Sequence, residues 1–150
     1  FLVSGASMEP NFRNGHYLLI DELSYRFREP KRGEVIVFRY PGDERTYYIK
    51  RVIGLPGERV VIKDGKVAIS NSEDPNCFFL EENYLPEDIS TSGNVDTTLG
   101  DGEYFVMGDN RYYSFDSRNW GTLTRDEIIG VARIRLFPFT EISAFEATTY

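Results

Sequence analysis

The apolar residues of this chain occur in runs of about four, with Gly, Pro, Asn and Asp between them. Val35-Ile36-Val37-Phe38 is one of the longest runs. Short runs rich in Val, Ile, Tyr and Phe, separated by turn-forming residues, are typical of β-strands. A helix that crosses a bilayer needs roughly 20 apolar residues, far more than any run here. We therefore predict a mostly β fold, an antiparallel β-sheet domain with one or two short helices.

A hairpin is the clearest single element. Residues 59–63 and 66–69 flank Asp64-Gly65, a pair typical of the tight turn between antiparallel strands. By the same composition and punctuation, further strands are predicted over residues 1–3, 17–21, 35–40, 47–53, 104–107 and 131–137.

The remaining segments lie between these strands. Residues 70–102, here called the acidic segment, are polar and acidic and are predicted to be a long excursion or flexible loop. Thr124 and Glu127 have the spacing of a capping box, so a short helix is expected there, ending at Gly130. The 150 residues and the 41% hydrophobic content suit a single domain over residues 1–150 with a core of its own.

The charge of the chain excludes one class of partner. Its net charge is −7 and its sequence pI is near 4.8. Proteins that bind nucleic acid present clustered Lys and Arg to the phosphate backbone. The basic residues here are scattered, so we expect no nucleic-acid partner.

The single Cys77 and the single His16 exclude several kinds of site. They cannot form an internal disulfide or a zinc site rich in Cys and His, so no metal is expected, and no motif indicates a cofactor. A Ser-His-Asp triad would have to use His16, on the predicted turn just after Ser7. A Cys77–His16 dyad is disfavoured because Cys77 precedes Phe78 and Phe79 and fits an apolar filler.

A hydroxyl nucleophile can instead be activated by a neutral lysine, if burial lowers the pKa of the amine to roughly 7 to 8. Lys50 is a candidate, because strand alternation places Tyr48 and Val52 on its own face. The same pattern fits a strand lysine whose amine reaches solvent. Ser7 is the candidate nucleophile, but a serine in a glycine turn is equally explained by the turn itself. The pattern alone leaves these alternatives open.

Four sequence blocks together resemble a known family. They are Ser-Gly-Ala-Ser-Met-Glu-Pro at 4–10, Arg-Gly-Glu-Val-Ile-Val-Phe at 32–38, Tyr-Ile-Lys-Arg-Val-Ile-Gly-Leu-Pro-Gly-Glu at 48–58 and Gly-Asp-Asn-Arg-Tyr-Tyr-Ser-Phe-Asp-Ser-Arg at 108–118. In this order they resemble the conserved boxes of type I signal peptidases, membrane-bound Ser/Lys endopeptidases that remove signal peptides from exported proteins. The resemblance runs from Phe1 to about Pro138, outside the acidic segment, and implies a β fold of the signal-peptidase type.

The resemblance implies roles for particular residues. The serine before Met in the first block is the nucleophile, here Ser7, and the lysine of the third block is the general base, here Lys50. The serine that hydrogen-bonds the lysine amine falls on Ser114. Two structural ion pairs fall on Arg51 with Asp109 and on Asp116 with Arg118. Paired buried charges of this kind rigidify a site and have no free proton to exchange.

Attack by Ser7 on a carbonyl would produce an oxyanion, and the backbone N–H of Ser7 is the donor expected to stabilise it. In part of the resembling family, a serine two positions before the nucleophile supplies a second donor. That position is Gly5 here. The second donor is then expected to be a backbone amide or a water molecule.

The resemblance also implies a substrate site. Family substrates carry small residues at the first and third positions before the cut, and they bind as an added strand beside the residues that precede the nucleophile. Several positions match the family's substrate-binding residues: Phe1, Val3, Met8, Leu18, Tyr48 and Ile49. Apolar side chains of this kind would also suit an ordinary core.

The sequence begins at Phe1 without an initiator Met, so we expect a segment to precede it. In the resembling family that segment is a membrane anchor. The resemblance therefore implies a single-pass protein of the cytoplasmic membrane that contacts lipid through this anchor. Its catalytic domain would lie on the extracytoplasmic face, where it acts on the signal peptides of exported pre-proteins.

Two other functions remain as alternatives. A self-cleaving Ser/Lys protease of the repressor type would share the β fold and the catalytic pair, but it needs a scissile bond in a linker before the serine. Six residues precede Ser7 in the sequence. The other alternative is an inactive β module whose edge strand binds exported peptides.

Overall fold

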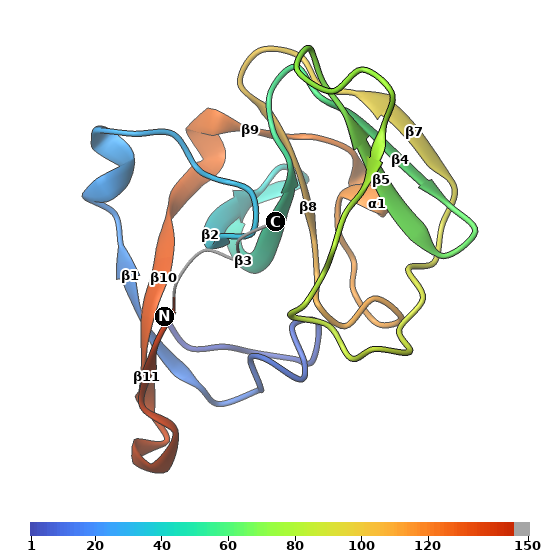
Figure 1. Cartoon of the computed structure of the whole chain (residues 1–150). Helices are drawn as coiled ribbons and strands as arrows, with labels where there is room; N and C mark the ends of the chain where they lie inside the picture. The colour runs from blue at the N-terminus through green and yellow to red at the C-terminus, as the bar shows by residue number, and fades with distance from the viewer. Residues whose placement is uncertain (146–150) are drawn as a thin grey trace.

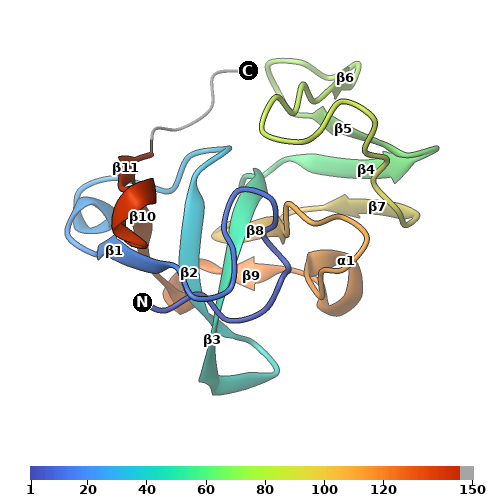
Figure 2. The same cartoon turned by 90° about the horizontal axis from the view of Figure 1, so that it is seen from below.

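Residues 1–145 form two antiparallel β-sheets in the computed structural model, which describes this part of the chain (Figures 1 and 2). The larger sheet contains β1 (Tyr17–Asp21), β2 (Val35–Tyr40), β3 (Asp43–Gly54), β8 (Glu103–Met107), β9 (Leu123–Thr124), β10 (Ile128–Phe137) and β11 (Ser143–Ala144). The smaller sheet contains β4 (Arg59–Lys63), β5 (Lys66–Ser70), β6 (Phe78–Phe79) and β7 (Val95–Thr98). The helical segments are short: α1 (Ser117–Trp120) and the 3-10 turns η1 (Ser24–Arg26), η2 (Arg125–Glu127) and η3 (Phe139–Glu141). The predicted mostly β, antiparallel fold is confirmed.

The strand β3 lies inside the larger sheet, whose strand order is β1-β10-β2-β3-β8-β9. Successive side chains of a strand point to opposite faces. Ile36 and Val52 pack in one cluster of buried side chains, whereas Val37 and Ile49 pack in another. The sheet therefore separates two cores, and neighbouring residues of β3 face different ones.

The predicted hairpin is present as β4 and β5. Asp64 and Gly65 have φ angles of 54° and 80°, the positive values that a two-residue hairpin turn requires. Ile62 and Ile69 of this hairpin belong to the same buried cluster as Phe105 of β8. This shared core holds the smaller sheet against the larger one. Figures 1 and 2 show how the strands of the two sheets are arranged.

The helix predicted near Thr124 is only the 3-10 turn η2. The capping hydrogen bond forms, with the Thr124 N–H donating to Glu127 Oε1 over 3.1 Å. The prediction that Gly130 ends a helix is wrong, because β10 already begins at Ile128. A Cβ on Gly130 would come within 2.6 Å of the Asp21 carbonyl oxygen. The close approach of β1 to β10 therefore explains this glycine, and local sequence gives no sign of it.

Two other predicted boundaries are wrong. Residues 1–3 form no strand and make only a single bridge, between Leu2 and Tyr17. The strand predicted over residues 47–53 begins earlier, at Asp43, because the tight turn after β2 pairs Tyr40 with Asp43. Pairing with β2 thus extends β3 into polar residues whose composition does not favour a strand.

The acidic segment is more ordered than a flexible loop. It contains β6, which pairs with β5, and β7, which pairs with β4. Thr91 is 3% exposed, and its N–H donates to the Gly65 carbonyl over 2.9 Å. The partners of this segment lie far from it in the sequence, so its polar composition could not reveal them.

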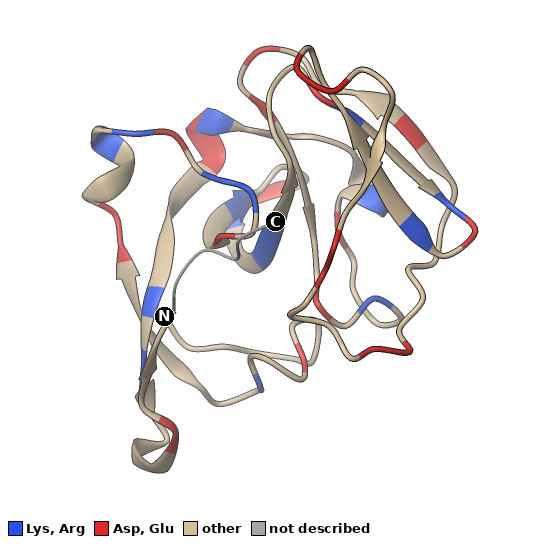
Figure 3. Cartoon of the chain, in the orientation of Figure 1, with Lys and Arg blue, Asp and Glu red and all other residues tan. Residues whose placement is uncertain are grey.

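Charged residues are spread over both sheets, with Lys and Arg interspersed among Asp and Glu along the ribbon (Figure 3). Across residues 1–145, no helix has the length and apolar character needed to span a membrane.

Candidate active site

Ser7 lies in a turn that two buried side chains anchor. Met8 is 1% exposed and Phe12 is 2% exposed, and the Phe12 N–H donates to the Met8 carbonyl over 2.9 Å. Both side chains belong to the buried cluster that includes Ile49 of β3. The spacing of these two apolar residues, one helical turn apart, fixes the turn to the sheet and leaves Ser7 half-buried at the surface.

Lys50 lies beside Ser7, with 2.9 Å between Lys50 Nζ and Ser7 Oγ. Lys50 is 4% exposed, and its Nζ also donates to the Ile49 carbonyl over 3.1 Å. Burial lowers the pKa of the amine from 10.5 to about 8, while the negative charges of Asp116 and Asp109 act in the opposite direction. The amine is therefore neutral in a substantial fraction of molecules at mildly alkaline pH and able to accept a proton there.

Aromatic rings cover the amine of Lys50. Its Nζ lies 5.0 Å from the centre of the Tyr48 ring. Tyr48 stacks on Tyr40, with 4.9 Å between ring centres, and Phe115 packs against Tyr40 at 5.8 Å. Burial withholds water from the amine, which is the physical origin of its lowered pKa, and the Tyr48 ring lies beside it.

The loop 108–118 holds the Ser7 turn in place. The Asn110 N–H donates to the Ser7 carbonyl over 2.9 Å, and Asn110 Nδ2 donates to the Ala6 carbonyl over 3.0 Å. A Cβ on Gly108 would collide with the Ser7 carbonyl, so only glycine permits this approach. Asn110 was not singled out from the sequence, although it lies in the fourth of the quoted blocks.

Both expected ion pairs are present. Arg51 Nη2 lies 2.7 Å from Asp109 Oδ2, and Arg118 Nη2 lies 2.9 Å from Asp116 Oδ2. The two carboxylates are buried, Asp116 also accepting from the Gly108 N–H over 3.0 Å. The pairs fix the ends of the loop 108–118 to β3 and to the start of α1.

Ser114 does not make the hydrogen bond expected of it. Its Oγ is buried and has no hydrogen-bond partner within the range that the structure covers. The Lys50 amine is directed at Ser7 Oγ and the Ile49 carbonyl instead. Ser114 nevertheless lies close to the site, because its side chain adjoins the position that a Cβ on Gly108 would take.

A groove of about 340 Å³ runs past Ser7 and Lys50. Of the predicted substrate-binding residues, three line it: Phe1, Tyr48 and Ile49. The other three lie in the core and are at most 3% exposed: Val3, Met8 and Leu18. The groove also has aromatic walls that the sequence did not single out: Tyr47, Tyr113 and Phe115.

Gly5 forms part of this groove in a conformation that suits glycine. Its φ is +87°, in the left-handed region, and a Cβ there would meet no atom within 4 Å. A serine would have room at this position but would strain the backbone. The Gly5 N–H donates to Asn14 Oδ1 over 3.0 Å, which tightens the turn before Ser7.

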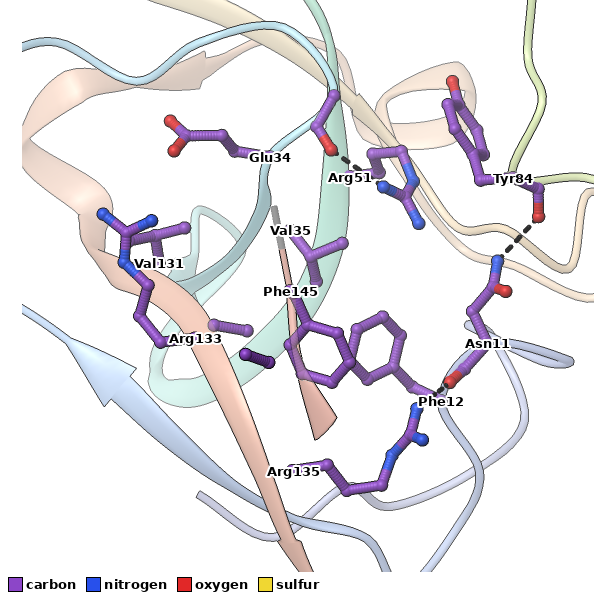
Figure 4. Close-up of a pocket in the computed structure, with 13 residues that line it drawn as sticks. Asn11, Phe12, Glu34, Val35, Arg51, Tyr84, Val131, Arg133, Arg135 and Phe145 are labelled. Carbon is purple, nitrogen blue, oxygen red and sulfur yellow. Dashed lines mark hydrogen bonds between the residues drawn. The ribbon is translucent and has the colours of Figure 1, made fainter. Parts of the chain in front are cut away.

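A second cavity, of about 300 Å³, is lined by Arg51, Val35 and other residues that Figure 4 labels. Arg51 and Lys50 are neighbours in β3 and therefore point to opposite faces of the strand. Asn11 forms one wall, where its Nδ2 donates to the Tyr84 carbonyl and to Asp109 Oδ2, over 2.8 Å in each case. This cavity thus borders the Arg51–Asp109 ion pair, on the face of β3 opposite to Lys50.

The residues set aside from the sequence lie elsewhere. His16 Nε2 is 3.1 Å from Glu141, and its Nδ1 accepts from the Arg13 N–H. Burial is the main cause that lowers the pKa of His16. Cys77 is a free, half-buried thiol in the acidic segment. Among residues 1–145 no three His, Cys, Asp or Glu side chains are grouped so as to hold a metal ion.

A half-buried hydroxyl within hydrogen-bond distance of a desolvated amine, in a groove beside a β-sheet, suits a hydrolase that works by acyl transfer. Comparisons with known proteins make the class specific. The family model described as "Signal peptidase, peptidase S26" matches residues 1–137. The chain belongs to this family, as the sequence blocks predicted.

Named relatives agree with this membership. A probable signal peptidase I-2 of Synechocystis sp. is 35% identical over 147 residues, which cover 93% of this chain and 63% of the relative. Signal peptidase I V of Bacillus subtilis is 36% identical over 138 residues, covering 87% of this chain and 81% of the relative. The crystal structure of a signal peptidase I from Enterococcus faecalis V583 superposes with a TM-score of 0.57 at 29% identity. It covers 69% of this chain and 97% of its own.

Proposed function

We propose that this chain is a serine endopeptidase that removes N-terminal signal peptides from exported pre-proteins, with Ser7 as nucleophile and Lys50 as general base. The observation that carries the proposal is the 2.9 Å separation of Ser7 Oγ from a lysine amine that is buried and has a lowered pKa. Membership of the signal peptidase family supports the same reaction class.

The chemistry is acyl transfer in two stages. The neutral Lys50 amine takes the proton of the Ser7 hydroxyl as Oγ attacks the carbonyl carbon of the scissile bond. The protonated amine then gives that proton to the leaving nitrogen, and the C–N bond breaks to leave an ester on Ser7. In the second stage Lys50 takes a proton from water as the water oxygen attacks the ester carbon. The C–Oγ bond then breaks, Lys50 returns the proton to Ser7 Oγ, and the signal peptide leaves with a free carboxyl group.

The oxyanion formed in each stage needs donors that are already in place. We assign the first donor to the backbone N–H of Ser7. Gly5 has no side chain that could donate, so we assign the second donor to another backbone amide or to water.

We propose that the substrate lies extended in the groove beside residues 1–5 and 47–49 and adds a strand there through main-chain hydrogen bonds. We further propose that the whole protein is anchored in the cytoplasmic membrane by a segment that precedes Phe1 and that the site faces the extracytoplasmic side. The relatives' names support signal-peptide substrates, and the chain spans 63% of the length of the Synechocystis relative.

The test is cleavage of a pre-protein, or of a peptide with an Ala-x-Ala sequence before the cut, followed by mass spectrometry. A single cut by the parent and none by Ser7→Ala is expected. Capture of a mass adduct on Ser7 with a penem inhibitor would identify the nucleophile. Binding of the peptide without any cut would contradict the proposal and favour an inactive peptide-binding module.

The groove also predicts selectivity. We propose that Ile49 and Tyr48, which line the groove, form a pocket beside Ser7 that accepts a methyl group. Packed walls resist a larger group by roughly 1 to 3 kcal/mol. Replacing Ala by Leu or Phe at the first position before the cut should slow cleavage strongly. The same change at the second position, which faces solvent in an added strand, should be tolerated. Equal rates for Ala and Phe at the first position would contradict the assigned pocket.

A further inference from the structure

Asn110 ties the nucleophile to the loop 108–118. Its backbone and side chain donate to the carbonyls of Ser7 and Ala6, the two peptide units on either side of the Ser7 nitrogen and Cα. The position of Ser7 Oγ relative to the Lys50 amine therefore depends on where the turn 108–111 lies. A shift of this turn would be carried directly to the Ser7 backbone.

Arg111 braces this turn from inside. Its side chain is 0% exposed, and its Nε donates to the Gly108 carbonyl over 3.0 Å, which closes the turn on itself. Its guanidinium is then directed out of the turn and into the acidic segment. There Nη1 donates to Thr91 Oγ1 over 2.7 Å and to Glu82 Oε1 over 2.9 Å, and Nη2 pairs with Glu82 Oε2.

We propose that Glu82 is a positioning residue for the Ser7–Lys50 pair. It holds the guanidinium of Arg111, Arg111 holds the turn 108–111, and Asn110 in that turn holds the backbone of Ser7. This inference rests on the proposed function of Ser7 and Lys50. It gives the acidic segment a role in the reaction although none of its residues lines the groove.

Two features favour positioning over plain stabilisation. A buried, bidentate ion pair fixes orientation, yet such pairs often add little net stability because desolvation offsets the attraction. A second connection from the same segment reaches the same loop. Asn11 Nδ2 donates to the Tyr84 carbonyl, as drawn in Figure 4, and also to Asp109 Oδ2. Tyr84 O–H also donates to Glu82 over 2.6 Å, so both ties belong to one network.

The experiment separates orientation from stability with a paired apolar replacement. Glu82→Leu together with Arg111→Met removes the buried guanidinium and its partly buried carboxylate partner at similar side-chain volume, so the melting temperature should stay near that of the parent. We expect kcat to fall by roughly tenfold or more, because small misplacements of reacting groups are costly. KM should remain within about twofold, since the groove residues are untouched. Thr91→Val, which removes one acceptor of Arg111, should give a smaller loss of kcat.

The matched control is the ion pair between Arg59 and Asp96, which joins β4 to β7 with both side chains about half exposed. Arg59→Met with Asp96→Leu should leave both kcat and KM unchanged. A paired Glu82 and Arg111 variant with parental kcat would overturn the proposal. So would a variant whose KM rises while kcat stays constant, because the acidic segment would then act on substrate binding.

A readout independent of cleavage distinguishes this inference from the proposed function. NMR of isotope-labelled lysine follows the titration of the Lys50 amine in the parent and in the paired variant. If the loop 108–118 loosens, water reaches the amine and its pKa should rise from about 8 towards 10.5. An unchanged Lys50 titration would contradict the positioning role even if no substrate were cleaved. Absence of cleavage by the parent alone would instead contradict the proposed function.

Discussion

The two faces of β3 hold neighbouring cations in opposite environments. On one face the Lys50 amine donates to Ser7 Oγ and the Ile49 carbonyl beside the Tyr48 ring, and among residues 1–145 no carboxylate forms an ion pair with it. On the other face Arg51 makes a bidentate ion pair with Asp109 and donates to the Gly33 carbonyl. Both side chains are buried, with exposed fractions of 4% and 6%.

The difference shows what burial does to a cation with and without a counter-ion. An amine without one loses hydration and becomes easier to deprotonate. A guanidinium with one keeps its charge and fixes geometry, because it cannot deprotonate in a protein. Strand alternation thus places the proposed general base on one side of β3 and the ion-paired arginine on the other, one residue apart.

The largest effect on the cleavage rate is expected from changes to the Ser7–Lys50 pair. Lys50→Met and Ser7→Ala should each lower kcat/KM by roughly ten-thousand-fold or more, and the double variant should be no worse than either, because the two residues act as a unit. Peptide cleavage measures the rate and thermal melting checks the fold. Lys50→Met should melt at the same temperature or higher, since it removes a buried amine. More than a few per cent of parental activity in Lys50→Met would refute the assigned base.

The pH dependence of the cleavage rate tests the proposed role of Lys50 further. The reactive form of Lys50 is the neutral amine, so the rate should rise roughly tenfold per pH unit below the pKa and level off above about 8. The sign for stability follows from the lowered pKa: between about 8 and 10.5 the unfolded chain binds the proton and the folded chain does not, so stability should rise with pH there. A rate that is flat between pH 6 and pH 8 would argue against a lysine base.

Loss of the Arg51–Asp109 ion pair should mainly lower the free energy of unfolding. Arg51→Met leaves the Asp109 carboxylate buried without its partner, which should lower the free energy of unfolding by about 3 to 5 kcal/mol. The matched change Arg59→Met, in the half-exposed pair with Asp96, should leave the free energy of unfolding nearly unchanged, because solvent screens this pair. Urea unfolding measures both. Equal losses would show that Arg51 does not have the structural role assigned to it.

The smallest effect is expected away from β3. His16→Gln and alkylation of Cys77 should leave the cleavage rate within about twofold of the parent, because neither group contacts Ser7 or Lys50 in the structure. A large loss on alkylation would mean that the acidic segment reaches the substrate, and the contrast between the faces of β3 would no longer account for catalysis.

The sequence by itself determined the β class, the Asp64-Gly65 hairpin and the family. Each of these depends on local signals: apolar runs with turn residues between them, a dipeptide that tolerates positive φ, and short blocks of fixed residues. The blocks also indicated Ser7 and Lys50 as a pair, although the pattern around Lys50 alone was equally consistent with an exposed lysine.

The tertiary structure decided what depends on residues distant in sequence. It placed Val3, Met8 and Leu18 in the core instead of the groove wall, and it directed the Lys50 amine to Ser7 and away from Ser114. These outcomes follow from packing and hydrogen-bond geometry across the sheet, which no local pattern encodes.

The acidic segment gives the strongest case. Its composition predicted a long excursion or a flexible loop without showing which. In the structure it adds two strands to the smaller sheet, and its Glu82 pairs with the buried Arg111. The local sequence does not distinguish a carboxylate that solvent hydrates from one that pairs with a distant guanidinium. Only the folded chain brings the two charges together. In water the attraction between two charges is weak, so the sequence of either segment does not indicate that they will pair.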